Sequence, residues 1–172
     1  LVTSPVPNDE AVKSAHTNFY WSEAVEVTKQ HKAHIVLAVL NGENNLMEAG
    51  ILFVKLSAST LNQDNATGIF TLETVFRGGF YRENAIQTIN VEKRFPLLNL
   101  VFLVLYTTDG QSVSAYTFGL EQLGRKEIEI VESKNSMEDV HMIIYNTVSY
   151  IIEQDIMLHT GETIGVDETQ KL

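Results

Sequence analysis

The stretch that decides the fold is PLLNLVFLVLYTTDGQSVSAYTF, residues 96–118. Its first part, residues 96–106, is apolar at both odd and even positions apart from Asn99, as expected for a central strand covered on both faces. The polar segment that follows contains Asp109 and Gly110, a pair typical of tight turns between antiparallel strands. Residues 113–118 then return as the second strand. The stretch therefore predicts an antiparallel strand pair within a sheet.

The sequence after this pair predicts one more strand and a long helix. In KEIEIVE, residues 126–132, charged and apolar residues alternate, which is the pattern of a strand with one buried face. Ser136 and Asp139 form a variant of the capping box, a signal for a helix start. The helix predicted over residues 137–154 carries an apolar stripe made of Met137, Val140, Ile144, Val148 and Ile151.

The sequence before this pair alternates predicted helices and strands. Short helices are predicted from Asp9 and from Ser22, followed by a buried strand over residues 35–40. A helix over residues 45–63 and a strand over residues 66–76 would complete a parallel strand–helix–strand unit with a right-handed crossover. Residues 77–93 predict a glycine turn and a short helix.

Together these elements predict an α+β fold, with helices packed on a mixed, largely antiparallel sheet of about five strands. The length of 172 residues fits a single domain, which we expect to cover residues 1–172. The chain starts at Leu1 and stops after DETQKL without an evident terminal element. We therefore expect the chain to be a processed, trimmed or excised piece of something longer.

The charge of the chain bears on its partners. It has 22 acidic and 12 basic residues, a formal net charge of −10. This charge repels phosphate backbones, so nucleic-acid binding is disfavoured, and it would attract a basic protein partner instead. The alternative is that the charge serves solubility alone.

The composition also bears on redox chemistry and location. The chain has no cysteine, which excludes disulfides, thiolate nucleophiles and cysteine-based metal sites. Its longest apolar run, PLLNLVFLVLY, is about half the ~20 residues that a membrane helix needs, and no secretion signal is recognisable. We predict a cytoplasmic protein with no membrane span, no cofactor and no bound metal, and we make no prediction of its oligomeric state.

Two glutamates are the candidate catalytic residues. Glu127 and Glu129 would point to one face of an extended segment, close enough to share a cation or to divide acid and base roles. With an imidazole such as that of His34, they would form a metal-assisted hydrolase site. The same alternation is also that of an ordinary half-buried strand, so both interpretations stay open.

Candidate binding residues lie around two glycine-containing segments. In YTFGLEQLG, Gly119 and Gly124 permit positive φ angles or the close approach of another segment. The later TGETIG, residues 160–165, offers hydroxyl and carboxylate groups to a ligand, or is a simple turn. The full set of binding candidates is Thr117, Gly119, Gly124, Thr160, Glu162 and Thr163.

Four segments carry a family resemblance. HKAHIVLAVL, AGILFVKLSASTL, YTFGLEQLGRKEIEI and TGETIG resemble, in order and approximate spacing, the bacterial domain of unknown function 4261 family, from about Pro5 to the C-terminus. The family has no established activity, so the resemblance implies no catalytic residue. Members of the family usually have further strand-forming sequence before the equivalent of PVPNDE and another strand after TIG, so the resemblance implies that flanking strands are missing at both ends of this chain. Its most specific residues are Thr117, Gly119, Gly124, Glu127 and Glu129, followed by Gly161, Thr163, Ile164 and Gly165.

Three functions remain open at this point. The first is a non-enzymatic binding module, of which an immunity protein that neutralises a basic toxin is one form. The second is the metal-assisted hydrolase, which requires the two glutamates and a histidine to converge. The third is a structural domain of a larger protein.

Overall fold

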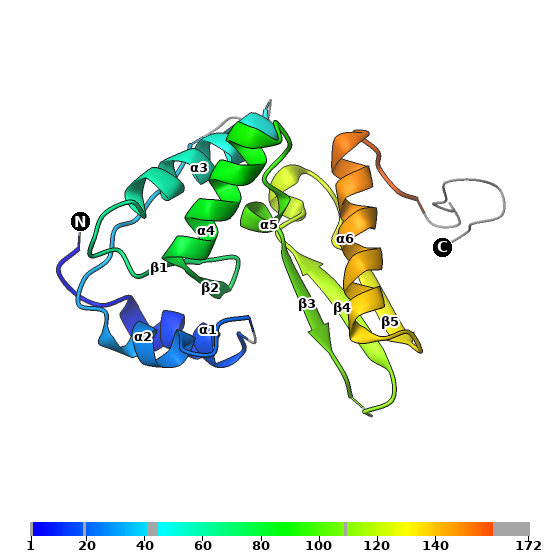
Figure 1. Cartoon of the computed structure of the whole chain (residues 1–172), viewed down its shortest axis with the longest axis horizontal. Helices are drawn as coiled ribbons and strands as arrows, with labels where there is room; N and C mark the ends of the chain where they lie inside the picture. The colour runs from blue at the N-terminus through cyan, green and yellow to red at the C-terminus, as the bar shows by residue number, and fades with distance from the viewer. Residues whose placement is uncertain (1, 19, 41–44, 109, 160–172) are drawn as a thin grey trace. The chain divides into compact units, whose positions relative to one another are not determined.

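The computed structural model describes residues 2–18, 20–40, 45–108 and 110–159. The chain divides into two compact units, residues 1–102 and 103–172, and each is described by itself. Figure 1 shows the helices and strands of both units along the chain.

The first unit packs helices around a two-stranded sheet. The strands β1 (Gly68–Thr71) and β2 (Thr74–Arg77) form an antiparallel hairpin. The core beside β2 is made of Ala11, Ala15, Ala24 and Val75. The helical elements of this unit are η1 (Pro7–Asp9), α1 (Glu10–His16), α2 (Ala24–Gln30), α3 (Leu46–Thr60), α4 (Gly78–Ala85), the π-helix η2 (Ile86–Val91) and α5 (Leu97–Leu100).

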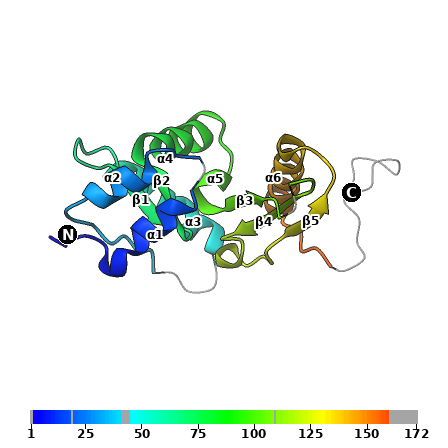
Figure 2. The same ribbon diagram turned by 90° about the horizontal axis from the view of Figure 1, so that it is seen from below.

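The second unit contains a three-stranded antiparallel sheet and one long helix. The strands are β3 (Phe102–Tyr106, of which Phe102 is counted with the first unit), β4 (Val113–Phe118) and β5 (Glu129–Ser133). They follow one another in the order β3-β4-β5, and the short helix η3 (Glu121–Leu123) lies between β4 and β5. The helix α6 (Met137–Glu153) contacts β4 and β5, and Figure 2 shows it on one side of these strands.

The stripe predicted for the last helix forms the core of this unit. Val140, Ile144, Val148 and Ile151 are all buried, while Met137 is exposed. Ser136 is the N-cap, because its hydroxyl accepts a hydrogen bond from the Asp139 backbone N–H at 3.1 Å. The predicted capping box and helix are confirmed.

The strand predicted over residues 35–40 is wrong. The segment pairs only at its start, through an isolated antiparallel bridge between Val2 and His34. Val36 is 72% exposed and Leu40 is 97% exposed. An apolar run forms a strand only when a neighbouring strand is available to pair with it, and no strand in the described part of the chain pairs with residues 35–40.

The predicted parallel strand–helix–strand unit is also wrong. Residues 66–76 form the hairpin β1–β2, with Gly68 opposite Arg77 and Thr71 opposite Thr74. The turn residues Leu72 and Glu73 have φ angles of 53° and 52°, the left-handed values of a tight hairpin turn. The pattern missed this turn because neither residue is a glycine or an asparagine.

The long strand predicted over residues 96–106 is shorter in the structure. Residues Leu97–Leu100 form α5, and only Phe102–Tyr106 are strand. The reason is Asn99, which is buried and hydrogen-bonds to α4 instead of facing a neighbouring strand. Its amide donates to the Tyr81 carbonyl at 2.9 Å and its oxygen accepts from Asn84 at 2.7 Å.

The α+β class is confirmed, with five strands shared between two antiparallel sheets in the described residues. The helices predicted near Asp9, after Ser22, over residues 45–63 and after residue 77 are also present. Within the described ranges, no helix combines the length and apolar character that crossing a bilayer requires.

Candidate functional site

The Glu127 carboxylate is held by Thr117 of β4 and by backbone groups of the loop that joins β4 to β5. Its Oε2 accepts a hydrogen bond from the Thr117 hydroxyl at 2.6 Å. Its Oε1 accepts from the backbone N–H groups of Gly119 at 2.8 Å and Glu121 at 3.2 Å. One carboxylate thus satisfies three donors, and hydrogen bonds to a charged acceptor are the stronger kind. In the structure, Glu127 serves to hold the loop closed.

Thr117, in β4, also bonds to the backbone of Ile128, the residue before β5. Its hydroxyl accepts a hydrogen bond from the Ile128 N–H at 2.8 Å, and its own N–H donates to the Ile128 carbonyl at 2.9 Å. Thr117 is buried, at 2% exposure. Thr117, a predicted binding residue, therefore makes structural contacts with Glu127 and Ile128.

Both glycines of the loop have positive φ angles, as expected from their positions. Gly119 has φ 117° and Gly124, which ends η3, has φ 71°. Side chains disfavour these angles, so glycine is needed for the chain to turn twice within six residues. Beyond Gly124, the Arg125 guanidinium pairs with the Asp155 carboxylate, which follows α6.

Glu129 lies two residues further on, in a different environment. It is directly opposite Tyr116 in the register of β4 and β5. Its Oε1 lies 3.5 Å from the Tyr106 hydroxyl, and the rings of Tyr106 and Tyr116 meet edge to face with centroids 6.1 Å apart. We call Tyr106, Tyr116 and Glu129 the tyrosine–glutamate face.

The alternation of side chains along the strands shows which side of the sheet this face occupies. The neighbouring pair, Ala115 opposite Ile130, points to the other side, where Ala115 is fully buried. Because α6 contacts β4 and β5 on that buried side, the tyrosine–glutamate face points away from α6. Tyr116 is 40% exposed and the Glu129 side chain is exposed. The two tyrosines were not identified as candidates from the sequence. Tyr106 is the last residue of the first predicted strand, and Tyr116 lies within the second.

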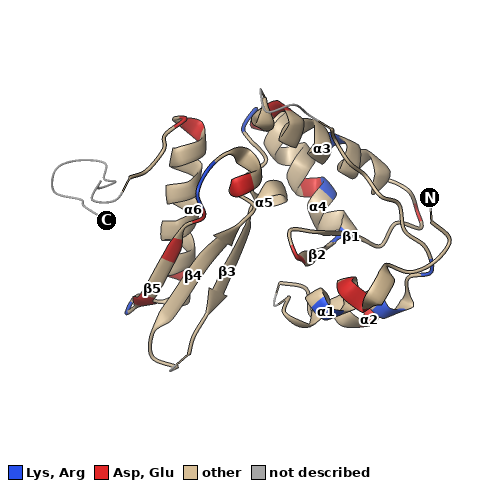
Figure 3. Cartoon of the chain, turned by 180° about the vertical axis from the view of Figure 1, so that it is seen from behind, with Lys and Arg blue, Asp and Glu red and all other residues tan. Residues whose placement is uncertain are grey.

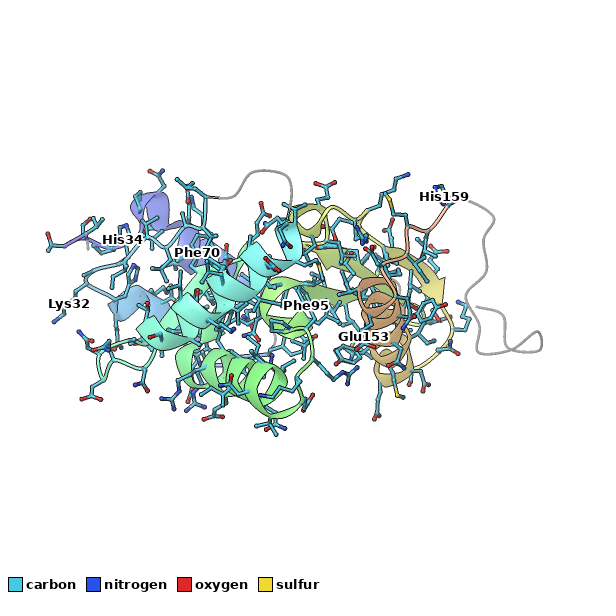
Figure 4. All side chains as sticks on the ribbon, turned by 90° about the horizontal axis from the view of Figure 1, so that it is seen from above. Lys32, His34, Phe70, Phe95, Glu153 and His159 are labelled. Carbon is cyan, nitrogen blue, oxygen red and sulfur yellow. The ribbon has the colours of Figure 1, made fainter. Side chains whose placement is uncertain are left out.

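His34 lies in the first unit, whereas both glutamates lie in the second. Its Nδ1 lies 2.8 Å from the Ser4 carbonyl oxygen, and its backbone pairs with Val2. Figure 4 labels it in the N-terminal part of the chain. The nearby His31 accepts a hydrogen bond from the Val6 N–H at its Nε2, at 2.8 Å. Both imidazoles thus contact the N-terminal segment.

A metal site would need several ligating side chains close together among the described residues. Among them, no group of three or more His, Asp or Glu side chains is arranged to hold a metal ion. The remaining binding candidates, Thr160, Glu162 and Thr163, lie outside the described residues.

The comparisons with known proteins bear on the same loop. The family model Domain of unknown function (DUF4261) matches residues 116–172, a range that begins at Tyr116 and includes the loop, β5 and α6. Over this part the chain is similar to that family, and the match supports the resemblance there; the matched range does not include residues 5–115. Comparisons with curated proteins and with solved structures gave no match.

Proposed function

We propose that the chain is a cytoplasmic, non-enzymatic interaction module. It binds a basic protein through the tyrosine–glutamate face. The observation that carries this proposal is the pairing of an exposed tyrosine ring, Tyr116, with an exposed carboxylate, Glu129, on the side of the sheet away from α6. An arginine or lysine of a partner would stack on the ring and pair with the carboxylate.

The charge of the chain supports the same kind of partner. A net charge of −10 attracts a basic protein over a distance and raises the association rate. Figure 3 shows acidic positions on β5 and on the turn between β4 and β5. An immunity protein that covers a basic toxin is the form of this function that best fits a small acidic chain.

The alternative, a metal-assisted hydrolase, needs Glu127 as a free carboxylate. In the structure this carboxylate already accepts three hydrogen bonds, from Thr117 of β4 and from two backbone N–H groups of the loop after it. Glu129 has the tyrosine hydroxyl as its neighbour at 3.5 Å. The interaction module is therefore the function that these contacts support best.

The proposal is tested with a short synthetic peptide of alternating arginine and glycine, labelled for fluorescence anisotropy. Because a cation on an exposed aromatic ring is worth about 0.5–1 kcal/mol, Tyr116→Ala is expected to weaken binding roughly two- to fivefold. Glu129→Gln is expected to weaken it by a similar factor.

The matched control is Glu48→Gln on α3, which removes the same charge from the other unit. It is expected to leave peptide affinity within experimental error of the wild type. If Glu48→Gln weakens binding as much as Glu129→Gln, the peptide responds to net charge alone and the proposed face is wrong.

A further inference from the structure

A groove in the first unit lies between α3 and the continuous helical segment formed by α4 and η2. It has a volume of about 330 Å³, which falls in the range of small-molecule sites. Figure 4 shows α3 and α4 running next to each other. The lining residues occupy one stripe of each helical segment: Lys55, Ala58, Ser59 and Asn62 on the α3 side, and Arg82, Ala85, Ile86, Ile89 and Asn90 on the other.

The charges in this groove are opposite to those of the chain as a whole. Both ionisable side chains in the lining, Lys55 and Arg82, are cationic, and the lining includes no carboxylate. The whole chain, in contrast, has 22 acidic residues against 12 basic ones. A groove lined by cations and amides favours an anion.

The geometry of Arg82 adds a second observation. Its Nη1 donates a hydrogen bond to the Asn62 side-chain oxygen at 2.6 Å, which ties the guanidinium to the α3 side of the groove. Its Nε is buried and has no hydrogen-bond partner among the described residues, an unfavourable state for a donor. Arginine binds carboxylates and phosphates through paired N–H groups, and because the contact with Asn62 uses Nη1 alone, Nη2 remains to donate to an anion.

Four of the lining residues are apolar: Ala58, Ala85, Ile86 and Ile89. Ala58 and Ala85 leave room between the two helical segments because their side chains are small. Ile86 and Ile89 line the groove from the π-helix η2. Such π-helical turns are rare in proteins, and those that occur are often at functional sites. The groove thus offers cations and an apolar surface together.

We propose that this groove binds a small organic anion, with a carboxylate or phosphate group on Arg82 and Lys55 and an apolar part against Ile86 and Ile89. Phosphate and carboxylate share the same recognition chemistry, an oxygen-bearing anion on a guanidinium fork. This site is separate from the tyrosine–glutamate face and lies in the other unit.

The test uses the full chain, labelled with ¹⁵N, and titrations with phenyl phosphate, benzoate, inorganic phosphate and uncharged benzyl alcohol. Phenyl phosphate, benzoate or both are expected to give saturable shifts of the Arg82 Nε–H resonance and of the amides of residues 55–62 and 82–90. Whichever of the two binds more tightly identifies the anionic group. Benzyl alcohol is expected to bind more weakly, and inorganic phosphate shows what the apolar part adds.

The decisive variant is Arg82→Gln, which is expected to weaken binding at least about tenfold. Its control, Arg77→Gln, removes the same charge from an exposed position of the same unit and is expected to change nothing. If Arg82→Gln fails to fold, Lys55→Gln on the exposed side of the groove replaces it, with an expected loss of about threefold. Absence of saturation by both anions, or equal losses in the groove variant and the control, would overturn the proposal.

Discussion

Glu127 and Glu129 are two residues apart, yet their carboxylates have different environments. Glu127 accepts three hydrogen bonds from β4 and the loop after it, whereas Glu129 lies beside two tyrosines on an exposed sheet face. The comparison teaches that the spacing of two acidic residues does not define their role. Their roles depend on how many hydrogen-bond donors the fold itself supplies to each carboxylate.

The first unit shows the same difference between its own polar groups. Asn99 is buried and both the nitrogen and the oxygen of its amide are hydrogen-bonded, to Tyr81 and Asn84. Arg82, which lies between these two residues in α4, keeps a buried Nε without a partner among the described residues. Polar groups that the fold satisfies stabilise it, and those that it leaves open are the candidates for binding.

The largest expected effect separates the two glutamates by stability. Glu127→Ala should lower the free energy of unfolding by about 2 kcal/mol, because three donors lose a charged acceptor. Glu129→Ala should change it by less than about 0.5 kcal/mol, as for most exposed substitutions. Urea denaturation of both variants measures the difference. Equal losses would remove the distinction between the two carboxylates.

The coupling between Thr117 and Glu127 sharpens the comparison further. Thr117→Val keeps the shape of the side chain but removes a buried hydroxyl with two partners, with an expected loss of about 1.5 kcal/mol. Combined with Glu127→Ala, the two losses should fall short of additivity by about 1 kcal/mol. A double-mutant cycle by urea denaturation gives this value. Strict additivity would show that the pair does not act together.

Two glycine substitutions are expected to have opposite signs. Gly124→Ala should destabilise the chain by about 1 kcal/mol, because alanine is strained at φ 71°. Gly79→Ala in α4 should stabilise it by about 0.5 kcal/mol, since an added Cβ would lie 4.0 Å from the nearest atom, a Glu83 side-chain oxygen. Thermal unfolding of the two variants checks the signs. Stabilisation by both changes would mean that the loop does not require its left-handed residue.

The smallest effect at neutral pH concerns the tyrosines. Burial raises the pKa of Tyr81, which is fully buried and donates a hydrogen bond to the Asn99 carbonyl at 3.2 Å. The unfolded chain therefore loses this proton first, so stability contributed by neutral Tyr81 falls as pH rises above the unfolded value near 10. Tyr81→Phe should flatten this alkaline decline, as followed by urea denaturation between about pH 8 and pH 11. An unchanged decline would assign it to other groups.

The sequence predicted the elements whose signals are local. The apolar stripe and the Ser136 cap of α6, and the helices of the first unit, follow from spacing that neighbouring residues enforce. Residues 35–40 and 66–76 were misread because an apolar run does not reveal whether a partner strand exists or where a turn without glycine falls.

The candidate residues were partly predictable for the same reason. The positive φ angles of Gly119 and Gly124 follow from residue type. The three donors to Glu127 come from positions 117, 119 and 121, and only the folded loop brings them to one carboxylate. Tyr106 and Tyr116 meet through the tertiary arrangement of the sheet, and the groove at Arg82 requires two helices to pack.

The most direct test crosses Glu127→Gln and Glu129→Gln with two measurements, the thermal midpoint and the affinity for the arginine–glycine peptide. The account predicts that Glu129→Gln keeps the thermal midpoint and weakens peptide binding. Glu127→Gln is predicted to lower the thermal midpoint and, at temperatures below that midpoint, to bind the peptide like the wild type. The opposite result, a stable Glu127→Gln that no longer binds and an unstable Glu129→Gln that does, would contradict the roles assigned to the two carboxylates.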